Sequence, residues 1–258
     1  EHPPAETIGR GQTTFATTFL SSALELRDRG LRLVNIGQVV QRSGFILVTK
    51  KASGISGPAD LNGKKVSLWR DFRVQPQAFF RKYGVEVIPV EQGANMNLFL
   101  RDGVVAASAM WYNEYHMLLN AGLNEEELSA FFFDRHGLNF PEDGLYCLEE
   151  TLRRNIDLCR GFVTASLEGW EYAFANPEET LDVVMGHIRK ANVGTNRVHQ
   201  RWMLARMKDI ILPPGGAADL GRLRREDYLR VAGEMKRGGL IKEIPPYGEM
   251  YVDCLTPR

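Results

Sequence analysis

The stretch A-A-S-A-M-W-Y-N at Ala106–Asn113, which runs on into Glu114 and Tyr115, decides the fold that we expect. Its small residues suit a strand packed on both faces. The stretch ends in the aromatic rings of Trp111 and Tyr112, the amide of Asn113 and the carboxylate of Glu114. Open α/β sheets bind ligands at the carboxyl ends of their strands, where rings offer a flat ligand a face and polar groups fix its edge. The alternative is a strand entering an ordinary helix, with Trp111 and Tyr112 as core residues.

Two strand–helix pairs precede this stretch. Strands are expected at Val66–Trp69 and Val85–Val90, and helices at Gln75–Tyr83 and Met96–Asp102. Strands and helices that alternate in this way predict a small parallel sheet with helices on its faces.

Further strands are expected on the N-terminal side, at Thr13–Thr18, Leu31–Gln41 and Phe45–Thr49, because β-branched and apolar residues are dense there. The C-terminal part is expected to be helical. Apolar residues at helical spacing predict helices over Leu152–Phe174, Thr180–Ala191, Arg197–Ile211 and Arg225–Lys236.

The composition excludes several classes of protein. The 258 residues suffice for two lobes with real cores. The 32 basic and 32 acidic residues cancel, so nothing demands a nucleic acid or an anionic membrane as partner. Cys147, Cys159 and Cys254 lack zinc-site spacing and allow at most one disulfide. We expect His187 and His199 to face solvent, and we find no nucleophile with its base, so no enzyme, cofactor or metal site is expected.

Several segments, taken together, resemble the substrate-binding proteins of ABC importers in the NMT1/THI5-like (SsuA/TauA/ThiY-like) group. The segments are G-Q-T-T-F-A-T-T at Gly11–Thr18, G-F-I-L-V-T-K-K-A-S-G-I at Gly44–Ile55, P-A-D-L-N-G-K-K-V-S-L at Pro58–Leu68, V-V-A-A-S-A-M-W-Y-N-E-Y at Val104–Tyr115 and G-L-I-K-E-I-P-P-Y at Gly239–Tyr247. The pattern P-A-D-L-x-G-K-x-V is the most specific of them, and together they span nearly the whole chain.

The resemblance implies an α/β, two-lobed periplasmic-binding-protein fold of type 2. One lobe would comprise residues 1–56 and 145–258, and the other residues 57–144, with hinge segments near Lys50–Ser56 and Gly144–Tyr146. Ligand would bind in the cleft and close the lobes. Members of the family begin with a further strand, helix and strand, roughly 50–60 residues on usual domain proportions, so we expect that Glu1 is not the natural start.

The resemblance also implies which residues line the cleft. From the first lobe we expect Thr17, Thr18, Gln41, Arg42 and Ser43. From the second we expect Trp69, Arg70, Asp71, Trp111, Tyr112, Asn113 and Glu114, and Asn139 and Asp143 would reach in from the loop before the second hinge segment.

Three ligand chemistries stay open at this point. Trp111 and Tyr112 would stack a flat ring and Glu114 would accept hydrogen bonds from an amino group, which suits a thiamin-pyrimidine precursor. Arg42 and Arg70 would instead suit the anion of a sulfonate or taurine. In a third alternative the chain resembles the enzymes of this fold that make the thiamin pyrimidine from pyridoxal phosphate and a histidine of their own, although the cysteine-rich motif of those enzymes is not present.

The partners implied by the resemblance are a small-molecule ligand and an ABC transporter permease in the membrane. We expect a monomer that binds no nucleic acid. The expected location is periplasmic, or the cell surface as a lipoprotein, with the signal segment outside this chain. A sensor subunit that binds ligand and signals to a membrane partner is an alternative role.

Overall fold

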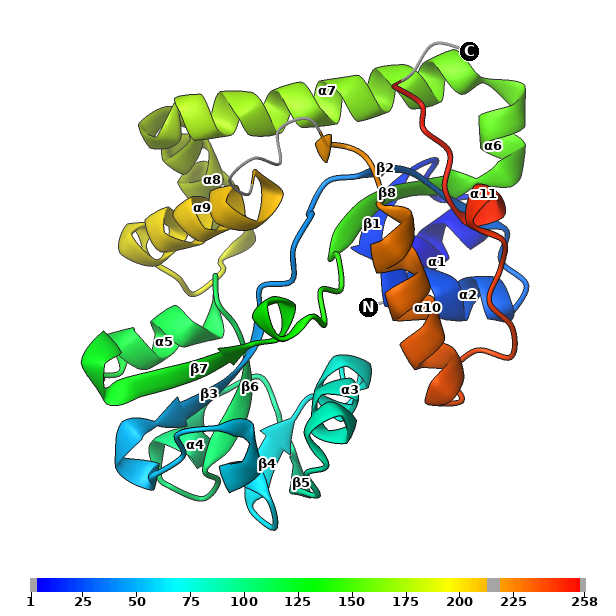
Figure 1. The fold of residues 1–258 in the computed structure, drawn as a ribbon. Coiled ribbons are helices and arrows are strands. Elements are labelled where there is room, and N and C mark those ends of the chain that lie inside the picture. Colours follow the sequence, from blue (N-terminus) through cyan, green and yellow to red (C-terminus); the bar gives the residue numbers. More distant parts are fainter. Residues whose placement is uncertain (1–3, 213–218, 256–258) are drawn as a thin grey trace. The chain divides into compact units, whose positions relative to one another are not determined.

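The computed structural model describes residues 4–212 and 219–255, and it divides the chain into two compact units. Unit 1 consists of Glu1–Ser43, Phe140–Pro177 and Lys208–Arg258, and unit 2 consists of Gly44–Asn139 and Glu178–Met207. Figure 1 follows the course of the chain through the elements of both units. Each unit is therefore assembled from segments that are distant in the sequence.

The helices are α1 (Pro4–Gly9), α2 (Leu20–Asp28), α3 (Val74–Tyr83), α4 (Asn97–Leu100), α5 (Glu114–Asn120), α6 (Glu149–Arg154), α7 (Ile156–Ala175), α8 (Pro177–Ala191), α9 (Arg197–Ile211), α10 (Arg225–Arg237) and α11 (Tyr247–Met250). The strands are β1 (Ala16–Phe19), β2 (Leu33–Gln38), β3 (Phe45–Lys50), β4 (Lys65–Leu68), β5 (Ile88–Glu91), β6 (Ala106–Met110), β7 (Leu128–Phe132) and β8 (Asp143–Leu148). Short 3₁₀ helices occupy Lys51–Ser53, Pro58–Leu61, Glu125–Glu127 and Phe133–His136.

The helix expected over Leu152–Phe174 is divided at Asn155, where α6 ends and α7 begins. Asn155 has φ −150° and ψ 79°, and its side chain accepts a hydrogen bond from the amide of Leu158. An asparagine in this position satisfies one of the free amides of the first turn, which favours a new helix start. The prediction of one continuous helix was wrong at this residue.

Unit 1 is built on a three-stranded sheet in the order β1-β8-β2 (Figure 1). Both outer strands run antiparallel to β8, so β1 and β2 run parallel to each other. Phe19 at the end of β1 pairs with Asp143 at the start of β8, and Gln38 at the end of β2 pairs with Gly144. The carboxyl ends of β1 and β2 therefore lie at one edge of this sheet.

A buried polar network lies beside the central strand of unit 1. The amide nitrogen Nδ2 of Asn35 donates to Gln38 Oε1 at 2.9 Å and to the Tyr146 hydroxyl at 3.1 Å. Gln38 Nε2 in turn donates to the carbonyl of Val40 at 3.0 Å. A Cβ atom at Gly144 would lie 2.5 Å from Asn35 Nδ2, so a glycine is required where this network crosses β8.

Unit 2 is built on a five-stranded mixed sheet in the order β5-β4-β6-β3-β7. As the alternating sequence pattern predicted, β4 is parallel to both β5 and β6. The strands β3 and β7 extend this sheet in antiparallel pairing. Gln92 joins β5 to β6, because its side chain donates to the carbonyl of Ser108 at 2.7 Å and accepts from the Ser108 amide at 3.0 Å.

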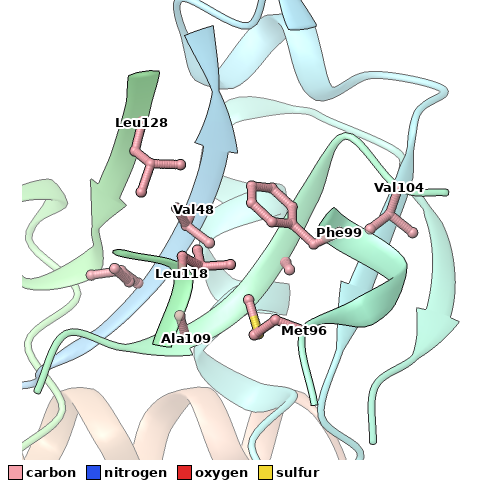
Figure 2. Close-up of a cluster of buried hydrophobic side chains, with 9 residues drawn as sticks. Val48, Met96, Phe99, Val104, Ala109, Leu118 and Leu128 are labelled. Carbon is pink, nitrogen blue, oxygen red and sulfur yellow. The ribbon is translucent and has the colours of Figure 1, made fainter. Parts of the chain in front are cut away.

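One face of the unit 2 sheet is covered by a cluster of apolar side chains. Figure 2 shows Met96, Phe99 and Leu118 turned toward Val48 of β3 and Ala109 of β6. Alanine on β6 leaves room for the larger side chains of the covering helices, which is the packing that the small residues of this strand indicated.

The two units differ from the lobes expected from the sequence. The second unit begins at Gly44 rather than at Gly57, and the first resumes at Phe140 rather than at Leu145. The segment Glu178–Met207, which was expected in the first lobe, packs with the second unit. Among the helices of residues 4–212 and 219–255, none combines the length and apolar character that crossing a membrane requires.

Candidate functional site

The carboxyl edge of the unit 2 sheet collects the predicted site residues of that unit. Since β4 and β6 are parallel, the residues that follow them, Trp69–Asp71 and Trp111–Glu114, leave the sheet at the same edge. Phe45 at the start of β3 pairs with Met110 and so lies at this edge too. Parallel strand ends are the usual place for a ligand in such a sheet.

Trp69 belongs to an aromatic cluster at this edge. The centroid of its ring lies 5.5 Å from that of Phe45 and 6.0 Å from that of Phe72. Phe45 also contacts Phe133 edge-on, with 5.2 Å between the centroids. The indole of Trp69 is half-buried and its Nε1 donates to the carbonyl of Gly93 at 3.4 Å. The sequence did not single out Phe45 or Phe133, because each lies in an apolar stretch that is typical of a core, nor Phe72, which lies between charged residues.

Arg70 forms an exposed ion pair beyond the end of β4. One guanidinium nitrogen of Arg70 lies 2.8 Å and 2.6 Å from the two carboxylate oxygens of Glu91. The hydrogen bond and the charge of Glu91 raise the pKa of Arg70. A ligand anion at Arg70 would compete with this carboxylate. Asp71, the next predicted residue, is exposed.

Trp111 has a packing role in unit 2. Its amide donates to the carbonyl of Gly44 at 2.8 Å, and its carbonyl accepts from Trp202 Nε1 of α9 at 2.9 Å. Its ring contacts Phe132 edge-on at 5.3 Å, and the guanidinium of Arg206 lies over it at 4.7 Å from the centroid. The same guanidinium lies 4.9 Å from the centroid of the Trp202 ring, so Arg206 makes cation–π contacts with both indoles.

A chain of hydrogen bonds leads from Glu114 to two histidines. The carboxylate of Glu114 accepts from the amide of Met110 at 2.9 Å and from Asn113 Nδ2 at 2.8 Å. Asn113 Oδ1 is then 2.9 Å from His199 Nε2, and His199 Nδ1 is 2.9 Å from His116 Nδ1. Burial raises the pKa of Glu114, against the hydrogen bonds that favour its ionised form.

His199 does not face solvent as expected from the sequence. Only 7% of it is exposed, as is 7% of His116, and burial lowers the pKa of both imidazoles. The ring of His116 also stacks on Trp202 with centroids 5.0 Å apart. The contact to Asn113 spans 86 residues of sequence, so no local pattern could indicate it. The expectation for His187, which is exposed, was right.

The predicted site residues of unit 1 gather at the carboxyl edge of its own sheet. Thr17 is exposed on β1 and Thr18 is half-buried, whereas Gln41 is buried and donates to the carbonyl of Gln38 at 2.6 Å. Asp143 is half-buried at the start of β8, and burial raises the pKa of its carboxyl group. The remaining predicted residues are half-buried or buried in their own units: Arg42 and Ser43 in unit 1, and Tyr112 and Asn139 in unit 2.

Histidine, cysteine and carboxylate side chains are the usual protein ligands of metal ions. Within residues 4–212 and 219–255, no group of three or more histidine, cysteine or carboxylate side chains is placed to hold a metal ion. The cysteines nevertheless converge, because Cys147 Sγ lies 3.9 Å from Cys159 Sγ and Cys254 is near enough to affect the pKa of Cys147. Their wide sequence spacing gave no sign of this.

Comparison with known proteins identifies the family of this chain. Residues 1–180 match the family described as NMT1/THI5 like, and the chain belongs to this family. It is 25% identical over 232 residues to the riboflavin-binding protein RibY of Chloroflexus aurantiacus; the match covers 85% of this chain and 65% of that protein. The chain thus spans less than two thirds of the length of this relative.

Solved structures show the same fold at low sequence identity. The periplasmic aliphatic sulphonate binding protein SsuA of Escherichia coli matches with a TM-score of 0.74 and 15% identity, covering 95% of this chain and 77% of that one. The sulfonate-binding SsuA of Methylobacillus flagellatus matches with a TM-score of 0.70 and 14% identity, covering 97% and 75%. The prediction of a periplasmic-binding-protein fold, α/β and of type 2, is confirmed.

Proposed function

We propose that this chain is the extracytoplasmic solute-binding subunit of an ABC importer and that its ligand is a small molecule with a flat heteroaromatic ring. The permease of the importer is its membrane partner, and the location is periplasmic or at the cell surface. Membership of the NMT1/THI5-like family supports this role, and so do the names of RibY and of the two SsuA proteins, which are binding proteins.

The observation that carries the choice of ligand is the half-buried indole of Trp69 at the carboxyl edge of the unit 2 sheet. Phe45 and Phe72 hold this ring in place, so it is a pre-organised surface for stacking. Stacking of a nucleobase on an aromatic side chain contributes about 1–3 kcal/mol. The name of the relative RibY, a riboflavin-binding protein, also favours a ligand with a flat ring. A flavin and an aminopyrimidine are the two candidate ligands.

A sulfonate is the weaker candidate for this edge, although structural neighbours, including both SsuA proteins described above, are named for sulfonate binding. Arg70 is already neutralised by Glu91 at 2.6–2.8 Å. A sulfonate group would have to displace that carboxylate before it gained the charge of Arg70. We still propose that Trp111, Asn113 and Glu114 contact the ligand. The same side chains also pack α5 and α9, so substituting them would affect folding as well as binding.

The test is a thermal-shift screen of the whole chain with riboflavin, hydroxymethyl- and formylamino-pyrimidines, taurine, alkyl and aryl sulfonates, and pyridoxal phosphate. A ligand that binds only the folded state raises the Tm. We expect a shift with riboflavin or a pyrimidine, and we expect Trp69→Ala to weaken that binding by about tenfold or more, because stacking is lost. Trp170→Ala in α7 of unit 1 is the matched control and should leave affinity unchanged.

Two results would overturn the choice of ligand. A shift with sulfonates that Arg42→Ala or Arg70→Ala abolishes and Trp69→Ala spares would identify an anion site. Bound pyridoxal phosphate, seen by its absorbance near the visible edge, would instead favour the pyrimidine-synthesising enzymes of this fold.

A further inference from the structure

The cysteines at positions 147 and 159 are adjacent in unit 1. Cys147 lies on β8, the central strand of the three-stranded sheet, and Cys159 lies in the first turns of α7. Their Sγ atoms are 3.9 Å apart, and both residues are 0% exposed. Neither is in a disulfide.

The packing of α7 on the sheet fixes this approach. Cys159, Val163 and Leu167 are the buried residues of α7, and their spacing of four places them on one face of the helix. A Cβ atom at Gly37 of β2 would lie 2.9 Å from Val163 Cγ1, so the helix sits directly on the sheet. Cys159 therefore meets β8 as part of a continuous helix–sheet contact.

We propose that Cys147 and Cys159 form a disulfide bond that fastens α7 to the central strand of unit 1. The sulfurs are already in van der Waals contact, and a bond of about 2.0 Å requires them to approach by roughly 2 Å through rotation of the side chains. This bond would be a covalent link within unit 1 and is separate from the binding of a ligand.

The oxidant is a protein disulfide or a small-molecule disulfide, which compartments outside the cytoplasm supply. The thiolate of one cysteine attacks the oxidant disulfide, forms a mixed disulfide and releases one thiol of the oxidant. The thiolate of the second cysteine then attacks the sulfur of the first and releases the other thiol. Two cysteine thiols lose two protons and two electrons, and one disulfide of the oxidant is reduced to two thiols.

The same burial determines when the bond forms. Burial raises the pKa of both Cys147 and Cys159, so the reactive thiolate is scarce in the folded unit. An oxidant also cannot reach side chains that are 0% exposed. The bond therefore forms while α7 is still undocked, during folding, and burial then protects it from reductants.

Peptide mapping tests the proposal directly, because trypsin separates the three cysteines. Cleavage after Arg135, Arg153, Arg154, Arg160 and Lys242 leaves Cys147 in peptide 136–153, Cys159 in peptide 155–160 and Cys254 in peptide 243–258. The whole chain is refolded with oxidised glutathione, remaining thiols are alkylated in denaturant, and the digest is analysed without reduction. We expect peptide 136–153 to be linked to peptide 155–160 and peptide 243–258 to be alkylated.

Controls distinguish this bond from unspecific oxidation. Refolding with dithiothreitol in place of oxidised glutathione should lower the Tm of the wild type and of Cys254→Ala by several degrees, and it should leave the Tm of Cys159→Ala unchanged. The reduced, folded protein should resist alkylation until denaturant is added. Full alkylation of all three cysteines after oxidative refolding, or a link between peptides 136–153 and 243–258, would overturn the proposal. The mapping uses the wild type, so it stands even where a variant fails to fold, and its result is independent of the ligand screen.

Discussion

The Nδ1 atoms of His116 and His199 lie 2.9 Å apart, although 83 residues separate the two histidines in the sequence. At this distance one nitrogen must donate a proton and the other must accept it. Two imidazolium rings would place like charges in contact inside unit 2. This pair links α9 to α5, and through Asn113 it orients the carboxylate of Glu114.

The first prediction concerns pH. The folded-state pKa of both histidines lies below the ordinary value of 6.5, so the unfolded chain takes up protons that the folded chain does not. The free energy of unfolding should therefore fall as the pH is lowered through about 6.5. His199→Gln should make the dependence of Tm on pH between 8 and 5 shallower. His187→Gln, at an exposed position, should leave it unchanged; equal slopes in wild type and His199→Gln would contradict the assignment.

The second prediction concerns Arg27, whose buried guanidinium contacts Glu149 at 2.7 Å, Glu249 at 3.1 Å and the carbonyl of Leu33 at 2.8 Å. Arg27→Ala should lower the free energy of unfolding by on the order of 2 kcal/mol. This is below the roughly 3–5 kcal/mol of a fully buried pair, because both carboxylates still reach water. Arg29→Ala, which removes an exposed pair with Glu25, should cost only about 0.5 kcal/mol. Urea titration measures both, and equal losses would refute the distinction.

The third prediction compares two glycines of unit 1. Gly144→Ala should destabilise by about 1–3 kcal/mol, because the new Cβ atom collides with Asn35 and Gln38. Gly161→Ala should stabilise by about 0.5–1 kcal/mol, because this helical position of α7 has no neighbour within 4 Å of a Cβ. Thermal unfolding of the two variants should give Tm shifts of opposite sign.

The fourth prediction concerns the apolar cluster of unit 2. Phe99 is 2% exposed and fills the space over β3 and β6, so Phe99→Ala should cost about 3–5 kcal/mol. Its neighbour Leu98 is 45% exposed, and Leu98→Ala should change stability by no more than about 0.5 kcal/mol. A small loss at Phe99 in urea titrations would mean that this cluster is not the core of the unit.

The sequence predicted local structure better than long-range contacts. The strand at β6 and the parallel arrangement of β4, β5 and β6 followed from small residues and from alternation along the chain. The division between α6 and α7 was also predictable, because Asn155 is a residue type that favours the start of a helix. The placement of α9 beside β6 could not, because the contacts of Trp202 and His199 depend on where the chain returns after nearly a hundred residues.

The candidate site was predictable at the level of strand ends and much less at the level of single residues. Trp69 and Trp111 both follow buried strands, and their sequence surroundings look alike. Both indoles are half-buried, but Trp111 lies against Phe132 and under Arg206, whereas Trp69 lies beside Phe45 and Phe72. Only the tertiary packing distinguishes the two indoles.

The division of the chain has a consequence for its biosynthesis. Unit 1 is interrupted twice by segments of unit 2, since the chain passes from one to the other at Ser43, Asn139, Pro177 and Met207. A ribosome therefore reaches the last segment of unit 2, Glu178–Met207, before the segment Lys208–Arg258 of unit 1. Until α10 and α11 emerge, helix α2 lacks its contact with α10 and strand β2 lacks its contact with α11, so the apolar faces of unit 1 stay exposed longest. Chaperones that act on the nascent chain would meet unit 1 rather than unit 2.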